Sequence, residues 1–376
     1  MLAVNSFISE VVVQSPGRIN FIGEHLDYNG GHVLPAAMNQ KITLKFRKNN
    51  SHMCHVTSGL LKNDFKVDLN NLVKTDTQWH NFIIGVLFHI NVLKPGVLKG
   101  FDCVIESDLA LGAGLSSSAA LECGLAKGIN ELFKIGLTDT ELIELSRDTE
   151  HTFIGTKCGI MDQFAIIKGK KNHLLFLNCE TFAYDLIKVD FKPYVIVLLN
   201  SNVSHNLANS AYNRRRDECS VALTIIKKKY PNYKFLSKVP LEILNEFEHV
   251  LSDEIYHRAL YIIEENKRSI NAVAHLKNCD FINFGNCLYQ SHYGLQQHYK
   301  VSCDELDFLV ELTKGLDYVL GSRMMGGGFG GCTINIVHST HVDQFIEDAK
   351  GAYRKTYNKE LSAIITTIDD GAHCLK

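Results

Sequence analysis

The stretch LALGAGLSSSAALE, residues 109–122, decides the fold that we expect of this chain. A strand-like FDCVI precedes it and a helical pattern follows it, so the stretch carries the chain from a strand into a helix. The free N–H groups and the dipole of a helix start favour an anion, and small residues let the anion come close. Two glycines and three serines supply these features: Gly112, Gly114, Ser116, Ser117 and Ser118. The stretch therefore predicts a phosphate site, with simple helix capping by the serines as the alternative.

This loop differs from a Walker A loop because it lacks the G-K-[ST] ending. Without that lysine, another group must balance the charge of the phosphate. We expect a magnesium ion in that role.

A second glycine-rich stretch, GSRMMGGGFGGCTINIV at residues 321–337, satisfies the G-x-G-x-x-G pattern at Gly326, Gly328 and Gly331. A dinucleotide-binding fingerprint of this kind must open a helix. Here the alternating residues CTINIV predict a strand instead, so we reject a dinucleotide-binding fold. The glycines indicate tight backbone packing, either beside a ligand or within a crowded hairpin.

The segment PGRINFIGEHLDYNGG, residues 16–31, crowds hydrogen-bonding side chains into a turn-rich stretch. Each hydroxyl of a sugar both donates and accepts, so recognition of a sugar needs carboxylate, imidazole and amide partners together. The segment supplies this mixture: Arg18, Asn20, Glu24, His25, Asp27, Tyr28 and Asn29. It therefore predicts a pocket for a ligand covered with hydroxyl groups. For His25 and Tyr28 the alternative is packing and stabilisation of the turn.

A carboxylate lies in apolar surroundings in EHTFIGTKCGIMDQFA, residues 150–165. Asp162 follows the turn at Gly159 and has apolar neighbours, where an ionised side chain is costly unless it is paired or catalytic. Arg18 is a candidate partner. The alternative is an acid with a purely structural role.

The composition excludes several classes of protein. With 376 residues, 39 basic and 41 acidic side chains and 45% hydrophobic residues, the chain suits two globular domains better than a nucleic-acid-binding protein. We interpret the basic runs at 214–216 and 227–229 as solvated helix faces. The 11 scattered cysteines lack metal-ligand spacing and indicate reduced thiols in the cytoplasm. We expect neither a signal peptide nor a membrane span, because no basic residue precedes Arg18 and the apolar run at 194–199 is short.

Strand and helix patterns alternate irregularly along the chain, which favours an α+β fold over a regular parallel α/β array. Strands are predicted at 11–13, 41–47, 332–338 and 361–369, and helices at 78–93, 121–133 and 210–229. A capping box at Thr138–Glu141 predicts the start of a further helix. The polar turn GKKN marks the weakest seam, so we expect an N-terminal domain at 1–178 and a C-terminal domain at 179–376.

In their order and spacing, these stretches resemble the galactokinases, members of the GHMP small-molecule kinase superfamily. GRINFIGEHLDY resembles the galactokinase signature, GAGLSSSAALE the ATP loop of the superfamily, and CGIMDQF the segment with the catalytic aspartate. SAYNRRRDEC and GSRMMGGGFGGCT resemble two further motifs. The resemblance covers residues 16–333 and implies a GHMP-kinase-like two-domain α+β fold, with the active site in the cleft between the domains. Met325 stands where relatives often carry a small polar residue, and we expect a packing adjustment there.

The resemblance implies an ATP-dependent sugar-1-kinase, which phosphorylates the C1 hydroxyl of galactose to galactose 1-phosphate with release of ADP. It makes Asp162 and Arg18 catalytic. It assigns galactose binding to Glu24, His25, Asp27, Gly159 and Tyr212. It assigns nucleotide binding to Gly112, Gly114, Ser116, Ser117, Ser118 and Trp79, with a core anchor as the alternative for Trp79. Mg²⁺ is the implied cofactor, bound by Ser117 and Glu150.

Two questions stay open at this level. Asp162 acts either as a general base or, in a loose transition state, mainly by positioning. The alternatives to a galactokinase are a galactose-sensing relative and a kinase for N-acetylgalactosamine or arabinose. The intact run Ser116–Ala120, with Arg18 and Asp162, favours catalysis. We expect galactose and ATP as partners, no nucleic acid or membrane, and a cytoplasmic monomer.

Overall fold

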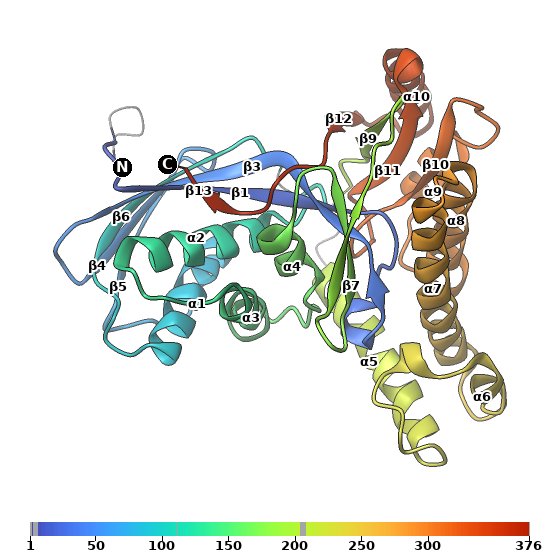
Figure 1. The fold of residues 1–376 in the computed structure, drawn as a ribbon, viewed down its shortest axis with the longest axis horizontal. Coiled ribbons are helices and arrows are strands. Elements are labelled where there is room, and N and C mark those ends of the chain that lie inside the picture. Colours follow the sequence, from blue (N-terminus) through green and yellow to red (C-terminus); the bar gives the residue numbers. More distant parts are fainter. Residues whose placement is uncertain (1, 3–6, 111, 204–207, 376) are drawn as a thin grey trace.

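The computed structural model describes residues 2, 7–110, 112–203 and 208–375. Figure 1 shows a broad sheet lined with helices in the N-terminal half and a column of long helices beside a smaller sheet in the C-terminal half. Both halves mix helices and strands, so the α+β prediction is confirmed. Within the described residues, no helix has the length and apolar character needed to cross a membrane.

A six-stranded sheet organises the N-terminal half in the order β13-β1-β3-β6-β4-β5. Its strands are β1 (Val11–Asn20), β3 (Pro35–Lys48), β4 (Met53–Ser58), β5 (Asn63–Asp68), β6 (Phe101–Ser107) and β13 (His373–Cys374). All neighbours are antiparallel except β4 and β6. Four helices cover one face of this sheet (Figure 1): α1 (Gln78–Leu93), α2 (Ser117–Phe133), α3 (Asp139–Thr149) and α4 (Met161–Lys168).

The alternation of β3 explains how this sheet meets its helices. Ile42, Leu44 and Phe46 are buried, whereas the residues between them are half-exposed. This is the period-two pattern that the sequence predicts for residues 41–47. At Gly128 of α2 a Cβ atom would lie 2.1 Å from the Phe46 ring, so only glycine lets the helix approach the strand this closely.

The C-terminal half contains a four-stranded antiparallel sheet in the order β10-β11-β9-β12. Its strands are β9 (Tyr194–Asn200), β10 (Val319–Met324), β11 (Cys332–His338) and β12 (Ser362–Thr366). Its helices are α5 (Ala208–Lys227), α6 (Leu241–Asn245), α7 (Asp253–Lys277), α8 (Phe281–Gly294), α9 (Asp304–Glu311) and α10 (Val342–Tyr357). Helices α7, α8 and α9 stand side by side next to β10 (Figure 1).

A small antiparallel sheet joins a strand from near the start of the chain to two from its middle: β2 (His32–Val33), β7 (His173–Asn178) and β8 (Tyr184–Lys188). Residue 178 ends β7, and β8 continues the same sheet. The last strand, β13, returns to β1 of the N-terminal sheet. The domain boundary at 178 stays a prediction.

Short helical turns complete the fold. They are the 3₁₀ turns η2 (Asp27–Asn29), η4 (Leu236–Lys238) and η6 (Ser339–His341) and the π-turns η3 (Glu150–Ile154) and η5 (Leu295–Tyr299).

Several local predictions are confirmed. Helix α1 spans residues 78–93, and the capping box at Thr138 and Glu141 forms both of its hydrogen bonds at the start of α3. The strand β11 begins directly after Gly331, the last glycine of the G-x-G-x-x-G pattern. A strand and not a helix follows the pattern, so the rejection of a dinucleotide-binding fold is confirmed. All eleven cysteines are free thiols.

The interpretation of the two basic runs is half right. Lys227, Lys228 and Lys229 are exposed, as a solvated face requires. The interpretation is wrong for Arg215, which is buried. Arg215 donates to Glu218 and to the carbonyl oxygens of residues 299 and 300. A run of like charges on a helix points in several directions at 100° intervals, and one of them here faces the interior.

Candidate active site

Arg18 and Asp162 form an ion pair although 144 residues separate them in the chain. Arg18 lies on β1 and Asp162 in the first turn of α4. Arg18 Nε donates to Asp162 Oδ1 at 2.7 Å, and Nη2 donates to Oδ2 at 3.2 Å. Burial lowers the pKa of Arg18, but the charge and hydrogen bond of Asp162 and the charges of Glu24 and Asp27 together outweigh it, so the pKa is raised. The predicted pairing is therefore confirmed, with the arginine fully charged.

The loop in front of α2 touches this pair. Arg18 Nη1 donates to the carbonyl oxygen of Gly114 at 2.6 Å, and Ser116 Oγ donates to Asp162 Oδ2. Ser116 adopts a left-handed backbone conformation, with φ of 57°, immediately before the helix begins at Ser117. The loop predicted to hold a phosphate and the acid predicted to be catalytic are thus in direct contact.

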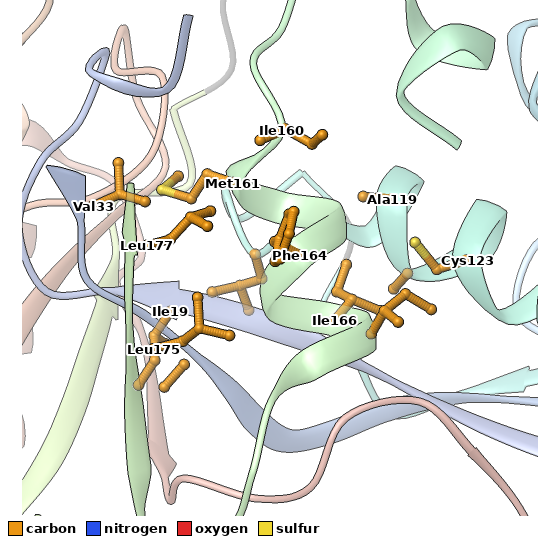
Figure 2. Close-up of a cluster of buried hydrophobic side chains, with 14 of the residues drawn as sticks. Ile19, Val33, Ala119, Cys123, Ile160, Met161, Phe164, Ile166, Leu175 and Leu177 are labelled. Atoms are coloured by element: carbon orange, nitrogen blue, oxygen red, sulfur yellow. The ribbon is translucent and has the colours of Figure 1, made fainter. Parts of the chain in front are cut away.

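Apolar packing fixes the position of α4 and with it Asp162. Figure 2 shows Met161, Phe164 and Ile166 of α4 within a buried cluster that reaches β1, β7 and α2. Further labelled members of this cluster are Ile19, Val33, Ala119, Cys123, Ile160, Leu175 and Leu177. Because close-packed cores hold side chains in single rotamers, the helix presents its first turn to Arg18 with little freedom. The dipole at the helix N-terminus also favours a negative charge at Asp162.

Glu24 is almost fully buried, with 1% of its surface exposed. Gly326 N donates to Oε1 at 2.7 Å, Arg323 Nη1 donates to Oε2 at 2.8 Å, and Asn20 Nδ2 donates to the same oxygen. Burial raises the pKa of Glu24, and the charge of Arg323 opposes this rise. The Glu24 carboxylate therefore joins the segment at residues 16–31 to the glycine-rich stretch at residues 321–337.

His25 is held with one ring nitrogen engaged and one available. Its Nδ1 atom hydrogen-bonds with the Tyr28 hydroxyl at 2.8 Å, and that hydroxyl in turn contacts the Tyr299 hydroxyl at 2.8 Å. Its Nε2 atom is buried and has no partner among the described residues. Burial lowers the pKa of His25 to about 3, so the ring is neutral at physiological pH. Tyr28 thus orients the imidazole, in line with the packing role considered for it.

Asp27 and Gly159 lie against each other. A Cβ atom at Gly159 would lie 2.2 Å from Asp27 Cγ, so any side chain there would displace the carboxylate. Burial raises the pKa of Asp27 to about 6, and repulsion by Asp162 adds to the rise. Two carboxylates therefore face the same space.

That space is a cavity of about 210 Å³. Its lining includes every residue that the sequence predicts to be catalytic or sugar-binding: Arg18, Glu24, His25, Asp27, Gly159, Asp162 and Tyr212. The lining also includes Gly326 and Gly327 from the loop between β10 and β11. Residues of both halves of the chain thus enclose one polar pocket.

A second cavity, of about 310 Å³, adjoins the first and shares Gln78, Phe82 and Ser118 with it. Its lining is mostly apolar and includes Trp79 and Ser117. The Trp79 ring packs edge-on against Phe65, and its Nε1 atom is buried with no partner among the described residues. Trp79 is thus both packed against the core and part of a cavity wall.

Glu150, which is predicted to bind a metal, accepts a hydrogen bond from the Ser118 side chain, and both residues line the polar cavity. Ser117 lines the adjoining apolar cavity. The assignment of Ser117 and Glu150 to a metal site stays a prediction. The helix starts at Ser117, and a rotation of about 100° per residue turns the next serine toward Glu150. Burial raises the pKa of Glu150 to about 7. Among the described residues, no group of three or more His, Cys, Asp or Glu side chains is arranged to hold a metal ion.

Sequence reasoning missed the residues that hold the loop before Asp162. Asn213 of α5 donates to the carbonyl oxygen of Gly155 at 2.9 Å and accepts from Lys157 N at 2.9 Å. Arg216 donates to the carbonyl oxygens of Lys157 and Cys158. Helix α5 also carries Tyr212, so one helix supplies a cavity wall and fixes the loop on the opposite side. Only the run of hydrogen-bonding residues in SAYNRRRDEC hinted at this role.

Family models match three parts of the chain. The model described as GHMP kinases N terminal domain matches residues 81–170, and the model for the GHMP kinases C terminal matches residues 272–355. The galactokinase galactose-binding signature matches residues 5–48, which include Glu24, His25 and Asp27.

Similar whole proteins agree with these matches. A galactokinase of Clostridium acetobutylicum is 38% identical over 96% of this chain and 94% of its own length. A galactokinase of Thermotoga maritima is 38% identical over 93% of this chain and 95% of its own. The crystal structure of Lactococcus lactis galactokinase complexed with galactose superposes with a TM-score of 0.93, at 31% identity and over 97% of this chain and 95% of that one. The Methanococcus jannaschii mevalonate kinase shares the fold, with a TM-score of 0.68 at 17% identity. This chain, with its paired Arg18 and Asp162 and its serine loop, belongs to the galactokinase family of the GHMP kinases.

Proposed function

We propose that this chain transfers the γ-phosphoryl group of ATP to the C1 hydroxyl of galactose and releases galactose 1-phosphate and ADP. Family membership makes it an ATP-dependent sugar kinase. The observation that carries the proposal is the three-way contact of Arg18, Asp162 and Ser116, which places an acid and its cation against the predicted phosphate loop. The galactose in the similar Lactococcus lactis structure supports the choice of sugar.

In the proposed reaction, Asp162 accepts the hydrogen bond of the C1 hydroxyl. As the new oxygen–phosphorus bond forms and the bond to ADP breaks, the hydroxyl proton passes to the carboxylate and then to solvent. Arg18 holds the carboxylate in place through their paired hydrogen bonds and offsets the charge that gathers around the reacting oxygen. Because phosphoryl transfer has a loose transition state, correct placement of the hydroxyl contributes as much as proton removal.

We propose that the other cavity residues select the sugar. Glu24 and Asp27 accept from hydroxyls, and the free Nε2 atom of His25 and the Tyr212 hydroxyl complete the polar wall. The Gly159 backbone closes the side next to Asp27. A pocket of this kind rejects an analogue that leaves a buried polar group without a partner.

The nucleotide lies, in this proposal, across the second cavity. Its base packs near Trp79, and its phosphates reach the glycine–serine loop between Gly112 and Ser118. Kinases of this type use a divalent cation, and we propose Mg²⁺ held by Glu150 and Ser118. One carboxylate and one hydroxyl suit Mg²⁺, which usually completes its shell with phosphate oxygens and water. When bound, the cation neutralises charge on the phosphates.

We propose that the chain works as a monomer in the cytoplasm. The chain itself supplies every residue that is predicted to be catalytic or sugar-binding. Eleven free cysteines suit a reducing compartment.

Sugar binding should depend on pH through Asp27. Its pKa of about 6 lies above the ordinary value of 3.8, so this group favours the folded state at low pH, and that contribution is lost as the pH rises through about 6. The sugar, by contrast, needs the carboxylate. The KM for galactose at saturating ATP and Mg²⁺ should therefore rise about tenfold per pH unit below pH 6.

His25 does not contribute to this change, because its pKa is about 3. An Asp27→Asn variant should have a higher KM that no longer responds to pH between 5 and 8. A pH response that survives in this variant would show that another group controls sugar binding.

The proposed function is tested by the release of ADP with a panel of sugars. Galactose should give the highest kcat/KM, above N-acetylgalactosamine, arabinose and glucose, and phosphorus NMR should place the new phosphate on O1. Binding of galactose without release of ADP would indicate a sensor. A higher kcat/KM for another sugar would overturn the choice of substrate.

A further inference from the structure

Arg323 is a fully buried cation whose side-chain hydrogen bonds go to the segment at residues 16–31. It stands on β10, and none of its side chain is exposed. Nη1 donates to the carbonyl oxygens of Asn20 and Phe21 at 3.2 Å each and to Glu24 Oε2 at 2.8 Å. Burying a charge is costly unless its partners are well placed. The buried arginine thus binds residues 20–24, and the last of these, Glu24, lines the polar cavity.

The hydrogen bonds of Glu24 leave it one acceptor position. An ionised carboxylate offers about four lone-pair sites. Arg323 and Asn20 occupy both sites on Oε2, and Gly326 N occupies one on Oε1. Glu24 itself lines the polar cavity. One site, on Oε1, therefore remains for a ligand.

Both of the strongest partners of Glu24 come from the same short stretch. Arg323 is the last residue but one of the strand β10, and Gly326 begins the glycine-rich turn that also lines the cavity. Two residues of the C-terminal half thus hold the Glu24 carboxylate by hydrogen bonds, although Glu24 belongs to the N-terminal half. Met325, between the two, is buried, and its sulfur accepts from Asn20 N.

We propose that Arg323 is a positioning residue: it fixes Glu24 as an acceptor for a single sugar hydroxyl and thereby sets part of the sugar specificity without touching the sugar. The inference rests on the proposed function, because it assumes that the cavity holds galactose. Arg323 is the largest influence that opposes the rise in the pKa of Glu24 on burial, so its loss favours the neutral carboxyl group. A neutral carboxyl group both donates and accepts, and it would tolerate a missing hydroxyl better.

The test measures kcat/KM for galactose and for each monodeoxygalactose in the wild type, Arg323→Met and Arg323→Lys. In the wild type, kcat/KM for the one deoxy analogue that lacks the hydroxyl bound by Glu24 should be lower than kcat/KM for galactose by about 10²-fold or more. In Arg323→Met, the ratio of kcat/KM for galactose to kcat/KM for that analogue should fall at least about tenfold, and the ratios for the other analogues should not change. The KM for galactose should rise, and the KM for ATP should change little. Arg323→Lys keeps the charge but not the planar fork and should be intermediate.

Arg258→Met is the matched control, since Arg258 is also a buried arginine, paired with Glu218 and Glu254, neither of which lines the cavity. It should lower the melting temperature and leave every deoxy ratio unchanged.

The inference is overturned if Arg323→Met lowers kcat/KM for all sugars by one factor, as Arg258→Met would. If Arg323→Met does not fold, the same measurement is made with Glu24→Gln. The ratio of kcat/KM for galactose to that for the same single analogue must fall in this variant. An unchanged ratio overturns the inference. A wild type that does not phosphorylate galactose would instead overturn the proposed function.

Discussion

The Asp162→Asn variant is expected to lose at least about 10³-fold in kcat, while it still binds galactose with an affinity close to that of the wild type. Asparagine keeps the shape of the side chain but cannot take a proton and carries no charge to pair with Arg18. The guanidinium then stays buried and keeps its hydrogen bond to Gly114 O. Pre-steady-state release of ADP and isothermal titration with galactose measure the two effects separately.

Loss of the ion pair should also cost stability, about 1–3 kcal/mol, because the partner charge is left buried while the Asp162 side chain is partly open to solvent, at 30% exposure. Asp102→Asn is the matched control. Asp102 also pairs with an arginine: its Oδ2 atom accepts from both Nε and Nη2 of Arg47, on the sheet and away from the cavity. It should lose stability and keep kcat. Near wild-type turnover in Asp162→Asn would contradict the catalytic assignment, and an equal loss in Asp102→Asn would attribute the effect to folding.

Gly159→Ala should raise the KM for galactose by about 10²-fold and leave the KM for ATP within a factor of three. The reason is geometric. The new methyl group would lie 2.2 Å from Asp27 Cγ and from Oδ2, and 2.6 Å from Asp27 Cβ, so the carboxylate must leave its place. Asp27 is half-buried and lines the same cavity as Asp162, so it has little room to move without changing the pocket. Steady-state kinetics with each substrate varied in turn gives both constants.

Gly351→Ala controls for the loss of a glycine. Gly351 lies in α10, and a Cβ atom there meets nothing within 4 Å. This variant should be more stable by up to about 1 kcal/mol, because alanine favours the helix, and it should keep both KM values. An unchanged KM for galactose in Gly159→Ala would contradict the pocket geometry, and a comparable rise in the KM for ATP would place Gly159 elsewhere in the reaction.

Patterns of short range made much of the fold predictable. The period of 3.6 residues located α1, the capping box located the start of α3, and the alternation in CTINIV identified β11 as a strand. These signals depend on neighbours in sequence, so they survive whatever the rest of the chain does. The motifs extended this reach because their side chains carry specific chemistry. All seven residues predicted as catalytic or sugar-binding line one cavity.

What the sequence did not reveal depends on direction and on contacts between distant segments. The choice between Ser117 and Ser118 beside Glu150 follows from where α2 begins and from the left-handed backbone of Ser116. The burial of Arg215 follows from the rotation of α5 against its neighbours. Arg323 reaches Glu24 across 299 residues of sequence, and nothing in its own neighbourhood marks a partner so far away.

The central claim is that Arg18 and Asp162 meet the reactive hydroxyl of the sugar where the serine loop delivers the terminal phosphate. A crystal structure with galactose, Mg²⁺ and a non-hydrolysable ATP analogue tests it most directly. We predict the C1 oxygen within hydrogen-bond distance of the Asp162 carboxylate and in line with the γ-phosphorus, with the phosphates on the loop from Gly112 to Ser118. A sugar whose C1 oxygen points away from Asp162, or a nucleotide bound outside that loop, would contradict the account.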